Sequence, residues 1–166
     1  MKERRLVIGY GNRLRGDDGV GWEVASRLAA AVPSEAAHIL TVHQLTPELA
    51  ELVSEADLAI FIDASHVGEP GTWRCDHVKP RCASGNSLGH HFDVAGLLAY
   101  SEAAFNATPR ALVVSVAAES FDFRDHLAPS LEAALPEVID FIRKIVCGAE
   151  SNQMTSLLLA TSSPRK

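Results

Sequence analysis

The amino-acid sequence predicts an α/β fold, a three-layer α/β/α sandwich around a mostly parallel five-stranded sheet. Short apolar runs typical of strands alternate along the chain with segments whose apolar residues recur at helical spacing. The strongest run, residues 58–62, shows no polar alternation, which favours a parallel sheet covered on both faces. The 166 residues fit one domain. We expect that domain to span 1–148, with a flexible, Ser- and Thr-rich tail over 149–166.

Five segments are expected to form the strands of this sheet. Residues 72–78 alternate only weakly and are flanked by Gly71 and Pro80, so we place this strand at an edge. If the strands follow the order 2-1-3-4-5, numbered along the chain, the first and third are neighbours. Their following loops then open at the carboxyl edge, where open α/β sheets hold ligands. The predicted strands are 6–8, 39–43, 58–62, 72–78 and 111–116.

Four segments show the apolar spacing of helices. The second of them is short and begins after Thr46-Pro47, which we interpret as an N-cap followed by proline at the first helical position. The last one is followed by Gly148, a common helix stop. The predicted helices are 20–31, the segment after Pro47, 94–104 and 129–146.

Composition and charge exclude several classes of partner. Fifteen Lys and Arg against 21 Asp and Glu give a net charge of −6, and no long basic run is present. Nucleic-acid affinity depends on neutralising phosphates, so we expect no nucleic-acid partner. The apolar runs are far shorter than the roughly 20 residues that span a bilayer, and we expect no membrane association. Three cysteines at no metal-like spacing and no export signal indicate a cytoplasmic protein with reduced thiols.

The glycine-rich loop after the first strand carries two adjacent carboxylates. Its glycines do not have the dinucleotide-binding spacing. Asp17 and Asp18 would also repel a pyrophosphate at the start of the following helix. An Asp at this place can cap the helix or bind a cation. We expect Asp17 mainly to shape or cap the first helix and Asp18 to face the ligand-binding edge.

Two further polar positions are expected at the same edge. Asp63 closes the third predicted strand, and the pair His90-His91 precedes the third predicted helix. Two carboxylates and one imidazole suit a divalent ion such as nickel or zinc. Three protein ligands that leave a position open fit a catalytic or transient site. We interpret the other histidines as surface or core residues, namely His38, His43, His66, His77 and His126.

A serine or cysteine nucleophile, as an alternative to the metal-dependent site, has weaker support in the sequence. Ser65 and Ser120 lie in no Gly-x-Ser-x-Gly elbow. Cys75 and Cys82 lie on or after the predicted edge strand, away from the proposed site, and inert thiols are the commoner case.

Three motifs together resemble the hydrogenase maturation endopeptidases. Residues 9–21 read Gly-x-Gly-Asn-x-Leu-x-x-Asp-Asp-Gly-x-Gly, residues 61–64 read Phe-Ile-Asp-Ala, and a histidine precedes the Leu-Leu-Ala at 97–99. The resemblance runs in order from about residue 6 to residue 146 and includes 119–121 and 127–129. It implies an α/β/α sandwich around five strands. It also implies removal of a C-terminal extension from the precursor of a [NiFe]-hydrogenase large subunit after nickel insertion.

The resemblance also implies which residues contact the metal and act in catalysis: Asp18, Asp63 and His90. Asp18 stands where many members have Glu, and His90 is preferred to His91 because it keeps the usual distance to 97–98. We therefore expect a cytoplasmic, nickel-dependent protease of the aspartyl type. We expect the substrate precursor to supply the nickel, with no metal permanently bound. The alternative is a non-catalytic, metal-dependent binder or chaperone of the precursor. A nucleotide-binding α/β protein is disfavoured by the acidic loop.

Overall fold

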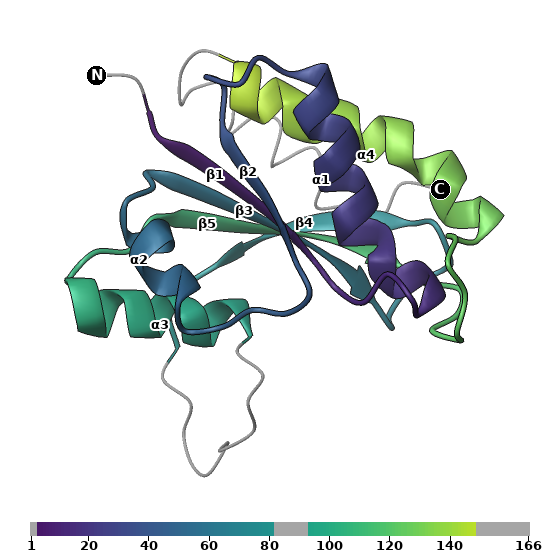
Figure 1. Cartoon of the computed structure of the whole chain (residues 1–166), viewed down its shortest axis with the longest axis horizontal. Helices are drawn as coiled ribbons and strands as arrows, with labels where there is room; N and C mark the ends of the chain where they lie inside the picture. Colours follow the sequence, from purple (N-terminus) through teal and green to yellow (C-terminus); the bar gives the residue numbers. More distant parts are fainter. Residues whose placement is uncertain (1–2, 82–92, 149–166) are drawn as a thin grey trace, which may run out of the picture.

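The computed structural model describes residues 3–81 and 93–148. Helices cover both faces of a five-stranded sheet, so the three-layer α/β sandwich is confirmed (Figure 1). The strands are β1 (Arg5–Tyr10), β2 (His38–Val42), β3 (Leu58–Ser65), β4 (Trp73–Val78) and β5 (Arg110–Ala117). The helices are the 3₁₀ helix η1 (Gly16–Gly19), α1 (Val20–Ala31), α2 (Leu49–Ser54), α3 (Val94–Phe105) and α4 (Pro129–Cys147).

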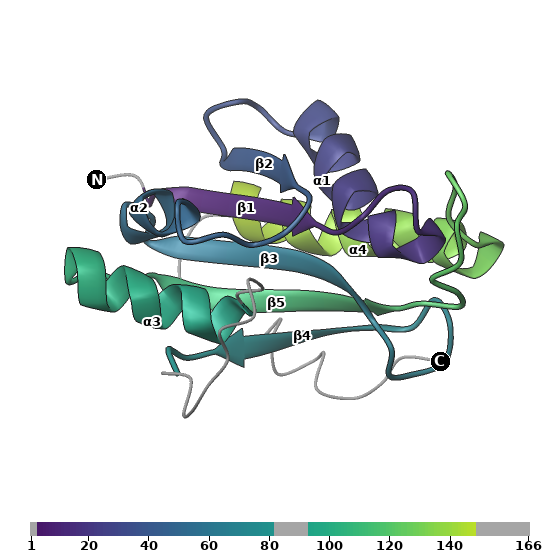
Figure 2. The same cartoon turned by 60° about the horizontal axis from the view of Figure 1, so that its bottom comes forward.

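The sheet order is β2-β1-β3-β5-β4, and only the β4–β5 pair is antiparallel. The expected order 2-1-3-4-5 is therefore wrong for the last two strands, although β1 and β3 are neighbours as expected and β4 lies at an edge (Figure 2). The reason lies in burial. β5 is largely buried and suits the place beside β3, whereas β4 is mostly exposed or half-buried and can leave one edge unpaired.

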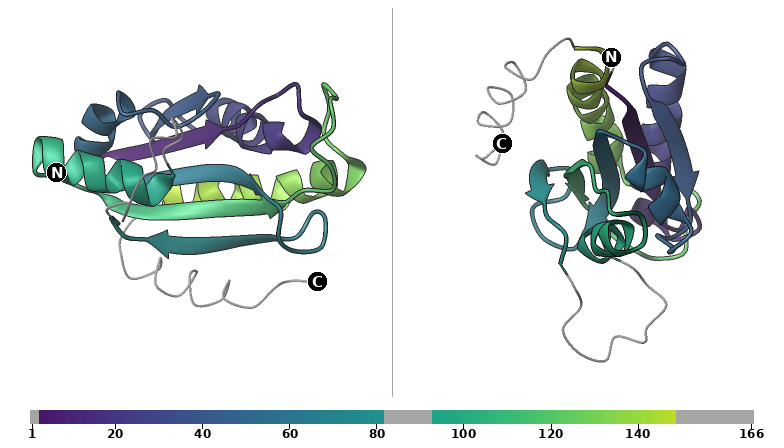
Figure 3. Two further views of the ribbon diagram at one scale, coloured as in Figure 1. Left: turned by 90° about the horizontal axis from the view of Figure 1, so that it is seen from below. Right: turned by 90° about the vertical axis from the view of Figure 1, so that its left-hand side faces the viewer.

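Two apolar cores lie on opposite faces of the sheet. Helices α1 and α4 cover one face, and α2 and α3 cover the other (Figure 3). In α4 the buried side chains recur three or four residues apart, so one stripe of the helix packs onto the sheet. These buried positions are Leu131, Leu135, Val138, Phe141, Ile142, Ile145 and Val146.

The observed elements begin and end close to the predicted positions, with two differences. Thr46 is not the N-cap of α2: the helix begins after Glu48, no side chain caps it, and the Thr46 carbonyl accepts a hydrogen bond from the Leu49 amide in the preceding turn. β3 does not stop at Asp63 but continues to Ser65, because it stays paired with β5 as far as Ala117.

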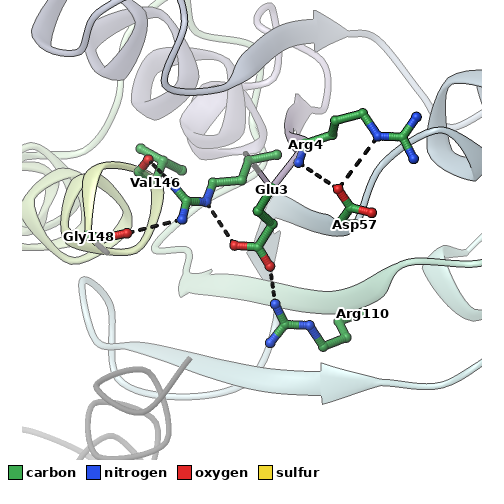
Figure 4. Close-up of polar contacts among 7 residues, drawn as sticks. Glu3, Arg4, Asp57, Arg110, Val146 and Gly148 are labelled. Atoms are coloured by element: carbon green, nitrogen blue, oxygen red, sulfur yellow. Dashed lines mark hydrogen bonds and ion pairs between the residues drawn. The ribbon is translucent and has the colours of Figure 1, made fainter. Parts of the chain in front are cut away.

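Arg5 joins the amino edge of the sheet to the end of α4. Its guanidinium donates hydrogen bonds to the carbonyls of Val146 (2.5 Å) and Gly148 (3.0 Å) and pairs with Glu3 at 3.1 Å (Figure 4). Only 12% of the Arg5 side chain is exposed. The last carbonyls of a helix have no hydrogen-bond donor within the helix. Arg5 supplies donors to two such carbonyls at the end of α4.

Several sequence predictions fall outside the described residues. These are the tail 149–166, and with it the division of the chain at residue 148, as well as Cys82 and the pair His90-His91. Within 3–81 and 93–148, none of the helices has the length and apolar character needed to cross a lipid bilayer.

Candidate functional site

Glycines bring α1 unusually close to the ends of β1 and β3. A Cβ on Gly9 would lie 1.9 Å from the Gly21 carbonyl oxygen, and one on Gly21 would lie 2.3 Å from the Ile62 carbonyl oxygen. Gly11 has a φ of +137°, a conformation that side chains with a Cβ rarely adopt. These contacts fix the loop between β1 and α1 against the carboxyl edge of the sheet.

Asp18 stabilises this loop through a hydrogen bond to a backbone amide of the same loop. Its Oδ2 accepts a hydrogen bond from the Asn12 amide at 2.7 Å, and the Asn12 side chain accepts one from the Leu14 amide at 2.9 Å. Asp18 is half-buried, and no described residue donates a hydrogen bond to its Oδ1. One carboxylate oxygen therefore holds the loop while the other stays available to a ligand.

Asp17 has a different position and caps neither η1 nor α1 with its side chain. The residue is fully buried. Its Oδ2 accepts hydrogen bonds from the amides of Glu119 (2.7 Å) and Ser120 (3.0 Å), and its Oδ1 accepts one from the Ala128 amide (2.7 Å). Asp17 thus shapes the site by joining the first loop to the segment between β5 and α4. The expected capping role is wrong.

Asp63 lies near the end of β3, beside the last residue of β1. Burial raises its pKa to about 6, the charge of Asp18 acts in the same direction, and a hydrogen bond from the Tyr10 hydroxyl opposes the rise. The Ala64 amide also donates to its Oδ1 at 2.8 Å. Burial and the Asp63 charge raise the pKa of Tyr10, so the phenol remains a neutral donor. The two carboxylates, 45 residues apart in the sequence, therefore act on each other electrostatically at one edge of the sheet.

Tyr10 and His66 are site neighbours that sequence reasoning missed. The pairing of β1 with β3 indicates that Tyr10 lies beside Asp63. Gly9 pairs with Ile62, so the next pair is Tyr10 with Asp63, and the side chains of paired residues face the same side of the sheet. His66, which we interpreted as an ordinary surface or core residue, is close enough for its charge to lower the pKa of Asp63. Its ring stacks on Phe121 with centroids 4.1 Å apart.

The predicted third ligand cannot be placed, because His90 and His91 lie outside the described residues. Among the residues that are described, no group of three or more His, Cys, Asp or Glu side chains is arranged to hold a metal ion. The two aspartates supply hard oxygen donors from two different elements, which fits a divalent ion that arrives with other ligands of its own.

The structure gives no support to a serine or cysteine nucleophile at the described positions. The Ser65 hydroxyl is engaged in a turn with Val67, and the Ser120 hydroxyl donates to Asp122 at 2.8 Å. Burial raises the pKa of Cys75 to about 12, so its thiolate is scarce at neutral pH. Cys75 packs against the core beneath α4, on the opposite face of the sheet from Tyr10.

Comparison with solved structures identifies the architecture. A [NiFe] hydrogenase maturation protease, HycI, from Thermococcus kodakarensis matches with a TM-score of 0.72 and 22% identity, over 89% of this chain and 94% of that one. The hydrogenase maturating endopeptidase HybD from E. coli matches with a TM-score of 0.71 and 23% identity, over 89% and 95%. The chain has the fold of the hydrogenase maturation proteases.

A third structure of similar fold is the hydrogenase 2 maturation peptidase from a Thaumarchaeota archaeon, with a TM-score of 0.67 and 22% identity over 89% of this chain and 100% of that one. No protein-family model and no curated protein matches the sequence. Each of these three structures thus matches 89% of the chain.

Proposed function

We propose that this chain is an endopeptidase that removes the C-terminal extension from the precursor of a [NiFe]-hydrogenase large subunit after nickel insertion. The proposal is supported by the placement of Asp18, in the loop after β1, close enough to Asp63, near the end of the neighbouring β3, for its charge to raise the pKa of Asp63. It occurs in a chain with the fold of known maturation proteases. Fold by itself does not determine function, so the proposal depends on this site.

Nickel in this proposal belongs to the substrate. Asp18 and Asp63 offer carboxylate oxygens to the ion, and at neutral pH a carboxyl group with a pKa of about 6 is mostly ionised. A cation between the two carboxylates would offset their mutual repulsion. The Tyr10 hydroxyl and the Ala64 amide hold Asp63 in place. We assign His90 as the third ligand on the resemblance of its motif. The precursor supplies the remaining ligands, and no metal stays bound after release.

Cleavage then follows the chemistry of metal-assisted hydrolysis, without a covalent acyl-enzyme. The substrate's ion polarises the scissile carbonyl or lowers the pKa of a bound water to about 7. An ionised carboxylate not bound to the ion takes the proton of the attacking water and delivers it to the amine nitrogen as the peptide C–N bond breaks. Because docking needs the ion, a nickel-free precursor is not cut, and cleavage reports that nickel insertion is complete.

The test is incubation of the chain with nickel-loaded and nickel-free precursor, followed by mass spectrometry of the large subunit. We expect a shortened subunit from the nickel-loaded form alone, with no inhibition by serine- or cysteine-directed reagents. Equal cleavage of both forms, or complete inhibition by a thiol reagent, contradicts the proposed chemistry. A stable complex without shortening would identify a binder or chaperone instead.

A further inference from the structure

Three arginines at the carboxyl edge of the sheet form no ion pair with a carboxylate of residues 3–81 and 93–148. Ten arginines lie within residues 3–81 and 93–148, and seven of them form ion pairs with Asp or Glu. The other three are Arg13, Arg15 and Arg124, and none of them pairs with a described carboxylate. Arg13 and Arg15 lie in the loop before η1, and Arg124 lies between β5 and α4. The exceptions thus gather beside the candidate site.

Backbone hydrogen bonds hold these two loops side by side. The Gly16 amide donates to the Arg124 carbonyl at 2.9 Å, and the Arg124 amide donates to the Leu14 carbonyl at 3.2 Å. Arg15 and Arg124 form a parallel bridge. The backbone around the three arginines is therefore held in place, and Arg13 and Arg15 are close in sequence to Asp18.

Exposed apolar side chains lie among these arginines. Five large apolar residues are exposed in the described part of the chain, and three of them are Leu14 (65%), Val67 (69%) and Phe123 (85%). Leu14 lies between Arg13 and Arg15, Phe123 precedes Arg124, and Val67 follows the His66 ring that stacks on Phe121. We define the loop rim as the surface formed by Arg13, Leu14, Arg15, Val67, Phe123 and Arg124.

Most acidic residues near the rim in sequence are already engaged. The Asp17 carboxylate accepts three backbone amides, and one Asp18 oxygen accepts the Asn12 amide. Asp122 accepts a hydrogen bond from Ser120, and Asp125 pairs with His126 at 3.0 Å. The rim cations have weaker contacts: Arg13 lies over the Trp22 ring at 5.3 Å, and Arg15 Nε donates to the Phe121 carbonyl at 3.4 Å.

Arg124 is half-buried, unlike the exposed Arg13 and Arg15. Its Nε is buried and has no hydrogen-bond partner among the described residues. In a chain of net charge −6, the exposed side chains of Arg13 and Arg15 are cations that carboxylates of another molecule can reach.

We propose that the loop rim is the docking surface for the hydrogenase large-subunit precursor, and that it takes a segment carrying apolar side chains flanked by Asp or Glu. This inference rests on the proposed function, because it assigns the substrate of the same site. Guanidinium groups pair with carboxylates in a planar, two-bond geometry. A few residues supply most of the binding energy in protein interfaces, and aromatic and arginine side chains are enriched among them.

The experiment measures precursor binding separately from cleavage. Each protein is mixed with nickel-loaded precursor, and its affinity is measured at low and high salt from the association and dissociation rates in the first moments after mixing, before cleavage proceeds. Rim variants are R13E/R15E and F123S. Matched controls are K79E and F105S, which change an exposed lysine after β4 and an exposed phenylalanine at the end of α3. Melting temperatures of all variants establish that they fold.

We expect R13E/R15E and F123S each to weaken binding at least tenfold, and the controls to change it less than twofold. The effect of R13E/R15E should shrink at high salt, since screening acts on exposed charges. The effect of F123S should persist. Rim variants that bind the precursor as tightly as the unmodified chain would overturn the docking surface.

The two proposals fail in different ways. If the unmodified chain cuts the precursor but rim variants bind normally, the docking surface is wrong and the function stands. If the chain binds through the rim but never cuts, the endopeptidase proposal is wrong and the docking surface stands. If the chain neither binds nor cuts the nickel-loaded precursor, both are wrong.

Discussion

The Asp17 carboxylate accepts a hydrogen bond from the amide of Ala128, which lies 111 residues further along the chain, at 2.7 Å. Ala128 is the residue before α4, so this bond fixes the entry to the helix. The same carboxylate accepts two more amides from the segment after β5. One buried side chain therefore holds two loops of the candidate site together.

We predict that Asp17→Asn lowers the free energy of unfolding by about 2–4 kcal/mol, because an amide cannot accept all three hydrogen bonds and its NH₂ group would face backbone donors. Urea denaturation measures the change, with the exposed Asp125→Asn as control. Equal stability of the two variants would contradict the role of Asp17.

Asp18→Asn should instead abolish cleavage and leave the fold intact. Its Oδ1 can still accept the Asn12 amide after rotation, so the loop keeps its bond while the site loses a charge. We expect activity to fall at least about 100-fold with the melting temperature nearly unchanged. Asp18→Glu, which restores the charge, should recover part of the rate. Full activity in Asp18→Asn would show that the wrong carboxylate was chosen.

Tyr10→Phe tests the hydrogen bond to Asp63. That bond favours the ionised carboxylate, so its loss should raise the pKa of Asp63 further above about 6. At a fixed pH below 7, a smaller fraction of Asp63 is then charged. Carbon-13 NMR of the side-chain carboxyls follows the titration in the metal-free protein. The free energy of unfolding should change by only about 1 kcal/mol. A lower pKa in Tyr10→Phe would contradict the bond.

Arg5→Met should destabilise the chain by about 1–3 kcal/mol, because the carbonyls of Val146 and Gly148 lose a charged donor. The neighbouring Arg4 is the matched control, since its side chain is 66% exposed and pairs with Asp57 at the surface. Arg4→Met should lower the free energy of unfolding by much less than Arg5→Met. Thermal unfolding of both variants makes the comparison, and an equal loss would show that the position of Arg5 has no special importance.

Truncation after Gly148 tests the predicted tail. The carbonyl of Gly148 that accepts from Arg5 is retained as part of the new terminus, so we expect nearly unchanged stability and activity. The measurements are the melting temperature and the cleavage assay. A drop of several degrees would mean that residues 149–166 stabilise the domain.

The sequence determined those features that depend on neighbours a few residues away. Apolar spacing predicted the helices because burial of one stripe repeats every three or four residues, as in α4. An unbroken apolar run predicted β3, which is buried on both faces. The sequence also showed the Asp17-Asp18 pair and the glycine-rich loop. The close approach of α1 to β1 at these glycines was seen only in the structure.

The tertiary structure decided what joins segments that are distant along the chain. The sheet order became known only from the position of β5 between β3 and β4. Strand pairing depends on which strands have apolar faces that the rest of the fold can bury. The partners of Asp17 and the contact of Tyr10 with Asp63 follow from that arrangement. No local pattern encodes them, because hydrogen bonds across loops form only where the folded sheet brings the two backbones within about 3 Å.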